Sequence, residues 1–169
     1  MRTNRRSTFL KAKLKTLSGL TRTVRALKRR GKTIVFTNGC FDLLHYGHVR
    51  YLEQAKAKGD ILVVGVNSDG SVRKIKGKGR PIVGEQERSR VIAALESVDY
   101  VVIFKEEIPL RVIKALRPDI LVKGADWKSS GIVGSGIVKS YGGRILRLRL
   151  VKGLSTTALV RKIAKIPKK

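Results

Sequence analysis

The sequence predicts an α/β domain built on an open parallel sheet, with helices covering both faces of that sheet. The first indication is the run at residues 60–67, whose interior is wholly apolar, as a central strand covered on both sides requires. The second is that short apolar runs alternate along the chain with segments of helical periodicity. Strands joined in this way form parallel pairs with right-handed crossovers, which gives a three-layer, Rossmann-like architecture.

The elements follow one another at the spacing of this architecture. Leu20, Val24 and Leu27 share one face of an amphipathic helix at residues 21–30, and Gly31 is a typical residue to end it. Apolar runs predict strands at residues 33–37, 60–67, 100–104, 120–122 and 144–151. Helical periodicity predicts helices at residues 46–58, 85–95, 108–116 and 131–141, with a last helix from about residue 155.

A mobile loop is expected at residues 68–84, because Gly, Lys and Ser dominate this stretch. Four of its cations make it a candidate lid over a site for anionic substrates, namely Lys74, Lys76, Lys78 and Arg80. The alternative is a solvated charged loop, which is the interpretation we favour for Lys78.

The net charge of +26 is the unusual feature of the composition. The first thirty residues hold eleven Lys or Arg, and no acidic residue precedes Asp42. We expect a basic arm at residues 1–19, partly disordered, and a single domain at residues 20–169. The arm would either bind nucleic acid or belong to a generally basic protein with anionic substrates. We favour the second, because basic residues run through the whole chain and few aromatic residues are interleaved with them.

Location is predicted by what the sequence lacks. No apolar stretch approaches the roughly 20 residues that span a bilayer, and the basic N-terminus has no apolar core of a secretory signal. The single cysteine, Cys40, excludes an internal disulfide and suits a reducing compartment. We therefore expect a cytoplasmic protein with no membrane span. A homodimer is a separate expectation, which these features do not bear on.

Polar and conformationally special residues follow four of the predicted strands. They occupy residues 38–48, 67–69, 123–127 and 153–157. Ligands of such sheets bind beyond the carboxyl ends of the strands, near the point where the strand order reverses. The sequence therefore predicts one site at that edge, assembled from segments far apart in the chain.

Both histidines of the chain, His45 and His48, lie three residues apart where a helix is expected to begin. On one face of that helix, both imidazoles are able to donate hydrogen bonds to one phosphoryl group. Gly39 permits close approach of the backbone to a ligand. The hydroxyls at residues 155–157 open another helix, where they either bind a second anionic group or simply cap that helix.

Other interpretations of these residues remain open. The histidines could form a metal site or a satisfied buried pair, although no third histidine and only Cys40 are present to complete a metal site. Asp42 could ligate a metal or fix the turn by accepting hydrogen bonds from backbone N–H groups, and we favour the second. For Phe41 we expect hydrophobic packing, and for Gly47 close packing of helix and strand.

Two motifs about 105 residues apart resemble the signatures of the cytidylyltransferase-like nucleotidyltransferases, namely Gly39-x-Phe41-Asp42-x-x-His45-x-Gly47-His48 and Gly153-Leu154-Ser155-Thr156-Thr157. Within that family, further stretches are similar to the adenylyltransferases of bacterial ADP-heptose synthesis, namely residues 37–42, 66–69, 76–81, 98–100 and 121–124. The likeness covers residues 32–166. It implies the nucleotidyltransferase fold and the transfer of AMP from ATP, with Mg²⁺ carried by ATP, to D-glycero-β-D-manno-heptose 1-phosphate.

Related activities stay open. The acceptor could be another phosphorylated compound, such as glycerol 3-phosphate with CTP, or a flavin or pantetheine phosphate with ATP. A different class of function is a basic nucleic-acid-binding protein that retains a vestigial nucleotide pocket.

The resemblance implies a role for each matching residue. The catalytic residues would be His45 and His48. The nucleotide would be bound by Asn38, Gly39, Cys40, Phe41, Lys123, Gly124, Asp126, Ser155, Thr156 and Thr157, with Trp127 nearby. The acceptor would be bound by Asn67, Asp69, Lys76 and Arg88. In one departure, Leu150 stands where relatives that use CTP carry an arginine, so Lys152 or Arg161 would replace that arginine.

Overall fold

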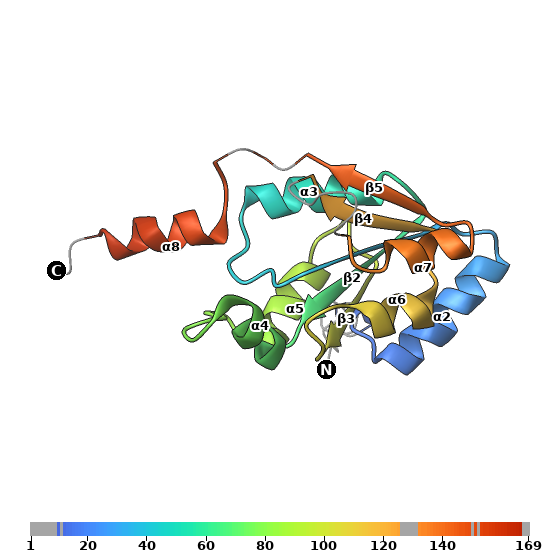
Figure 1. Cartoon of the computed structure of the whole chain (residues 1–169), viewed down its shortest axis with the longest axis horizontal. Helices are drawn as coiled ribbons and strands as arrows, with labels where there is room; N and C mark the ends of the chain where they lie inside the picture. Colours follow the sequence, from blue (N-terminus) through green and yellow to red (C-terminus); the bar gives the residue numbers. More distant parts are fainter. Residues whose placement is uncertain (1–9, 11, 126–131, 150, 152, 167–169) are drawn as a thin grey trace, which may run out of the picture.

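The computed structural model describes residues 10, 12–125, 132–149, 151 and 153–166. Within these ranges, five strands form one sheet, in which every neighbouring pair is parallel. Their order is β3-β2-β1-β4-β5 (Figure 1). The strands are β1 (Ile34–Gly39), β2 (Ile61–Asn67), β3 (Tyr100–Phe104), β4 (Ile120–Gly124) and β5 (Arg144–Leu148). The predicted open parallel sheet is confirmed.

Helices cover both faces of the sheet, as a three-layer architecture requires (Figure 1). They are α2 (Leu17–Arg29), α3 (Tyr46–Lys56), α4 (Asp69–Lys76), α5 (Glu85–Ala93), α6 (Leu110–Leu116), α7 (Ser135–Ser140) and α8 (Thr156–Ala164). Side chains of α3 and α5 share one core cluster, and side chains of α2, α6 and α7 share the other. α8 extends away from the sheet and has no buried residue.

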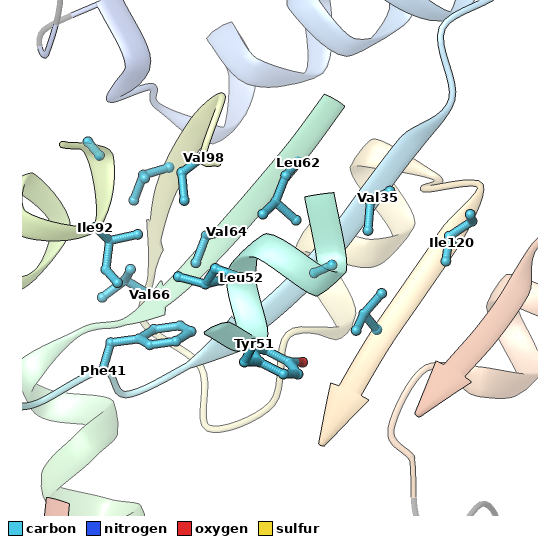
Figure 2. Close-up of a cluster of buried hydrophobic side chains, with 14 residues drawn as sticks. Val35, Phe41, Tyr51, Leu52, Leu62, Val64, Val66, Ile92, Val98 and Ile120 are labelled. Carbon is cyan, nitrogen blue, oxygen red and sulfur yellow. The ribbon is translucent and has the colours of Figure 1, made fainter. Parts of the chain in front are cut away.

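Alternation along the strands divides the core between the two faces. Val35 of β1 lies in the cluster with Leu52 of α3, whereas Phe36 lies in the cluster with the α6 side chains. Figure 2 shows Leu52 and Phe41 beside Val64 and Val66 of β2. Burying each such apolar side chain contributes about 1.5–3 kcal/mol, which is why the central strands are apolar on both faces.

The prediction of a mobile loop at residues 68–84 is wrong for the first half of this stretch, which forms α4. Ser68 caps this helix, because its Oγ accepts a hydrogen bond from the N–H of Ser71 at 3.2 Å. Val72, on the inner face of this helix, is buried. The sequence does not predict this short helix clearly, because it contains a glycine and because Lys and Arg occupy its exposed face. Its capping serine was the available signal.

The arm expected at residues 1–19 also ends earlier than predicted, because the domain already includes residues before 20. Thr16 caps α2 by accepting from the N–H of Gly19 at 3.2 Å. Leu14 forms a parallel bridge with Val101 of β3 and packs against the core. Residues 1–9 and 11 lie outside the described part of the chain. In the described part, no helix is both long and apolar enough to cross a membrane.

Candidate active site

A cleft with a volume of about 810 Å³ lies at the carboxyl edge of the sheet. The chain runs from β1 to β2 on one side and later returns to β4 on the other side of β1, so the strand order reverses between β1 and β4. Residues from the ends of both strands line the cleft. The site therefore lies at the switch point where sheets of this kind bind ligands.

The two histidines stack on each other at the start of α3. His45 occupies the N-cap position, and His48 lies in the first turn. The ring centroids are 3.9 Å apart, and the ring planes differ by 24°. The edge of Phe41 contacts His48 at a centroid distance of 5.4 Å. A Cβ at Gly47 would lie 3.0 Å from the ring of His45, so the glycine makes room for this stack.

Burial keeps both imidazoles neutral. It lowers the pKa of His45, and burial together with the neighbouring His45 lowers the pKa of His48 to about 4. Nδ1 of each ring is buried and has no hydrogen-bond partner within the described residues. Buried polar atoms nearly always have a partner, so two unpartnered nitrogens in rings that line the cleft are unusual and mark this pair as a candidate for a functional role.

The turn after β1 presents backbone to the cleft and a side chain to the core. Phe41 adopts a left-handed backbone conformation with φ of 46°, which is costly for a residue with a Cβ. Its ring is held in the core cluster of α3 and α5, as predicted. Burial raises the pKa of the Cys40 thiol, so this side chain lines the cleft in its protonated form.

Asp42 joins this turn to the segment that follows α4. Its carboxylate accepts hydrogen bonds from the N–H groups of Ile82 at 2.8 Å and Val83 at 3.0 Å, and it pairs with Arg80 at 2.8 Å. Burial opposes ionisation of Asp42, but these donors outweigh it and hold the pKa below its ordinary value. The prediction that Asp42 binds backbone N–H groups is confirmed, although the groups belong to a distant loop.

Arg88 is buried beneath the turn and its side chain is 0 % exposed. It donates to the carbonyl oxygens of Val83 and Asn67, each at 2.8 Å, and to that of Cys40. It also pairs with Asp69 at 2.7 Å. The guanidinium of Arg88 is therefore enclosed and bonded to the protein, which favours a supporting role for it, and binding of the acceptor by Arg88 stays a prediction.

Lys123 and Asn38 meet across the switch point. Lys123 Nζ donates to Asn38 Oδ1, and only 9 % of Lys123 is exposed. Asn67 lies at the end of β2, where its Nδ2 donates to Ser71 Oγ at 2.8 Å. Asn38, Asn67 and Lys123 line the cleft, whereas Ser71 does not and supports Asn67 from α4.

The first residues of α8 reach the histidines. Ser155 Oγ accepts from the N–H of Ala158 at 3.1 Å, which confirms the predicted cap. Thr156 Oγ1 donates to the carbonyl oxygen of Leu43 at 3.4 Å. A Cβ at Gly47 would lie 3.4 Å from Cβ of Leu154. Two helix N-termini therefore meet at one cleft, and such termini attract anions.

Most of the site residues expected from sequence lie together. Those that line the cleft are Asn38, Gly39, Cys40, Phe41, His45, His48, Asn67, Lys76, Lys123, Gly124, Ser155, Thr156 and Thr157. Asp69, Arg88 and Arg161 do not line it. Asp126, Trp127, Leu150 and Lys152 lie outside the described residues.

Tyr51 lines the cleft and was missed. Its hydroxyl and that of Thr37 are 2.7 Å apart and hydrogen-bonded. Its position three residues after His48, on the same helix face, was the available signal. No group of three or more His, Cys, Asp or Glu side chains able to hold a metal ion is found in the part of the chain that the structure describes.

The parallel sheet, the stacked histidines and the second helix N-terminus define a nucleotidyltransferase domain. Comparison with known proteins agrees: residues 36–160 match the family model described as cytidylyltransferase-like, and the chain belongs to that family. The chain is 56 % identical over 152 residues to the bifunctional protein HldE of Geobacter metallireducens, covering 90 % of this chain and 31 % of that protein. It is also 56 % identical to HldE of Koribacter versatilis over 89 % of this chain and 31 % of the relative.

This chain thus spans about a third of the length of the curated relatives it matches. A solved lipopolysaccharide core biosynthesis protein from Thermoplasma volcanium matches 72 % of this chain and 98 % of its own, with 33 % identity and a TM-score of 0.60. Pantoate–β-alanine ligase from Francisella tularensis, at 17 % identity and a TM-score of 0.59, shares the fold.

Proposed function

We propose that this chain transfers AMP from ATP to a sugar 1-phosphate and releases pyrophosphate, with D-glycero-β-D-manno-heptose 1-phosphate as the first candidate acceptor. Family membership supports the class of reaction. The similarity of residues 37–42 and 121–124 to ADP-heptose-forming enzymes, and the identity with HldE relatives, support the acceptor.

The observation that carries this proposal is the meeting of the stacked histidines with the N-terminus of α8 in one cleft. Hydroxyls and free N–H groups at residues 155–157 suit the β- and γ-phosphates, and the turn at residues 39–41 offers backbone to the α-phosphate. The histidines would then act at the α-phosphate, where negative charge develops.

In the proposed reaction, an oxygen of the acceptor phosphate attacks the α-phosphorus in line, and the bond to pyrophosphate breaks as the new P–O bond forms. A phosphate monoester is ionised at neutral pH, so the chain needs no strong general base. Neutral His45 and His48 would donate N–H groups to the α-phosphate oxygens as charge builds on them. Mg²⁺ carried by ATP would neutralise part of the charge of the triphosphate.

The central prediction is that His48→Ala lowers turnover by ~10²–10³, the usual cost of removing one donor to a developing oxyanion. Pyrophosphate release from ATP and heptose 1-phosphate measures it. Arg50→Ala is the matched control, because Arg50 is exposed on the same helix. Near-normal turnover of a folded His48→Ala protein would remove the histidine pair from catalysis.

A substrate panel tests the choice of nucleotide and acceptor. We expect pyrophosphate release with ATP and heptose 1-phosphate to exceed that with CTP, and to exceed that with glycerol 3-phosphate and either nucleotide. A preference for CTP with glycerol 3-phosphate would replace the proposed activity by the related cytidylyltransferase reaction. A homodimer, a cytoplasmic location and binding of nucleic acid by the basic arm remain predictions.

A further inference from the structure

The helices on the two faces of the sheet differ in charge. α2, α6 and α7, which share one core cluster, hold seven Lys or Arg and no Asp or Glu. α3 and α5, which share the other cluster, hold four Lys or Arg and three Glu. Among these helices, the excess of positive charge is therefore concentrated in one layer, although basic residues run through the whole chain.

The three cationic helices lie side by side in that layer. α6 contacts both α2 and α7, and the three helices gather on one side of the sheet (Figure 1). Their outer surfaces form one face, which we call the basic face and define by its exposed cations. These are Arg22, Arg25 and Arg29 of α2, Arg111 and Lys114 of α6, and Lys139 of α7.

Few of these cations take part in ion pairs. Arg111 pairs with Glu106 at 3.4 Å. The other five have no carboxylate within ion-pair distance in the described part of the chain. On the opposite side of the sheet, by contrast, Arg50 of α3 pairs with Glu53 at 3.5 Å. The charges of the basic face are therefore free to interact with an anionic partner.

The spacing of arginines on α2 is unfavourable for the helix itself. Arg22 and Arg25 are three residues apart and Arg25 and Arg29 are four apart, so like charges are neighbours on one helix face. The helix dipole favours cations in the last turn, which includes Arg29 but neither Arg22 nor Arg25. A partner with closely spaced negative charges would relieve this repulsion.

The composition of the face favours a nucleic-acid double helix over a bilayer or a single strand. Four of its six cations are arginines, whose planar fork binds phosphate through two hydrogen bonds. A helix that lies in a bilayer surface inserts apolar side chains, and none of the exposed large hydrophobic residues in the described ranges belongs to α2, α6 or α7. These helices also contain no aromatic residue on which unpaired bases could stack.

We infer that the basic face binds the phosphate backbone of double-helical nucleic acid without reading its sequence. This inference goes beyond the proposed function and does not depend on it, since none of the six cations lines the cleft. A duplex carries about one negative charge per 1.7 Å of its axis, and arginines that contact it release bound counterions. The affinity should therefore fall steeply as salt is added.

The test compares two triple variants that remove the same charge from opposite sides of the sheet. The first removes the three exposed arginines of α2, and the matched control removes three exposed cations on the side of α3 and α5. The substitutions are R22Q/R25Q/R29Q in the first variant and R50Q/K58Q/R90Q in the control. Fluorescence anisotropy with labelled duplexes of about 20 base pairs, one of DNA and one of RNA, measures Kd for the full chain between about 0.05 and 0.2 M salt.

We expect the Kd of the first variant to rise by about 10–100-fold at about 0.15 M salt, and the slope of log Kobs against log salt to become shallower by about 2–3. The Kd of the control should change by less than about threefold. Equal losses in the two variants would mean that net charge alone determines binding, and would contradict the inference. An unchanged Kd in the first variant would place the binding on another part of the chain and would equally overturn it.

A second variant, R111Q/K114Q/K139Q, tests the same face through α6 and α7 and should show a loss of the same order. Thermal unfolding checks that each variant is folded, and pyrophosphate release should match the wild type, because the changed residues lie outside the cleft. If the wild type releases no pyrophosphate, the proposed function fails while the binding comparison stands, since duplex binding needs neither substrate.

The remaining arms of the experiment identify the partner. Binding to both duplexes supports recognition of the shared backbone, and the tighter of the two shows whether DNA or RNA is the preferred source. A single strand of the same length should bind more weakly, because its charge density is lower. Tighter binding of the single strand, or of vesicles that contain phosphatidylserine, than of either duplex at the same salt would reject the double helix as the partner.

Discussion

Arg88 shows at the scale of one residue how a buried charge organises this site. Its guanidinium joins the turn at Cys40, the end of β2, the start of α4 and the carbonyl of Val83. Arginine suits this position because its rigid fork donates in several directions at once. In a chain with 38 Lys and Arg, the sequence could not distinguish this arginine from those available to phosphates. Only the tertiary structure shows which carbonyl oxygens surround it.

We expect Arg88→Met to lower the free energy of unfolding by about 3–5 kcal/mol, because it leaves Asp69 and several buried carbonyl oxygens without their donor. Urea denaturation measures this loss. Arg90→Met, at an exposed position of the same helix, should change stability by no more than about 0.5 kcal/mol. An unchanged stability of Arg88→Met, together with a raised KM for the acceptor, would show that Arg88 binds the acceptor rather than supporting the fold.

The start of α3 is the element on which the histidine stack depends. Gly47 is buried in its first turn, where alanine would otherwise favour the helix by about 1 kcal/mol. A side chain there would press on the His45 ring at 3.0 Å and on Leu154 at 3.4 Å. The glycine is therefore retained at a cost to helix stability, because it lets the two motifs approach each other.

Gly47→Ala is expected to lower turnover by about 10-fold or more, since small displacements of catalytic groups are costly. Steady-state pyrophosphate release and thermal unfolding should be measured together, because stability is expected to stay within about 1 kcal/mol of the wild type. Gly136→Ala in α7 is the control, as a Cβ there meets nothing within 4 Å. Full activity of Gly47→Ala would show that the His45 ring can be displaced without lowering turnover.

Elements differ in how far sequence predicts them. The apolar run of β2 predicted the bounds of this strand to within one residue. A strand covered on both faces is a continuous apolar run, so its ends are clear in the sequence. α4 was missed, because a short exposed helix with one capping serine and one buried valine has a weak pattern. The N-terminal boundary was misplaced for a similar reason: Leu14 is held by pairing with β3, and no local pattern predicts a long-range bridge.

At the scale of the whole molecule, sheet topology brings together motifs about 105 residues apart. Their convergence was predictable, because the carboxyl ends of parallel strands share one edge. The contact of Lys123 with Asn38 in the cleft was not, since it depends on the register of side chains at the last residues of β1 and β4. Burial of His48 beside this cleft also makes the free energy of unfolding depend on pH.

The free energy of unfolding should therefore fall as the pH is lowered from about 6.5 to about 4, the ordinary and folded pKa values of His48. In this window the unfolded chain binds a proton that the folded chain excludes, so acid favours unfolding. The loss expected from His48 is about 1–3 kcal/mol after allowance for its partial exposure, and His45 adds to it in the same direction. Asp42, whose pKa is held below 3.8, loses its contribution only at lower pH.

Urea denaturation at a series of pH values measures this effect, with His48→Asn as the comparison. The asparagine does not titrate, so the slope between pH 4 and 6.5 should become shallower by the share that His48 contributes. An unchanged slope would mean that the imidazole accepts a proton in the folded chain as easily as in the unfolded one. The histidine pair would then be cationic below pH 6.5 and would attract the triphosphate by charge rather than by neutral N–H donation.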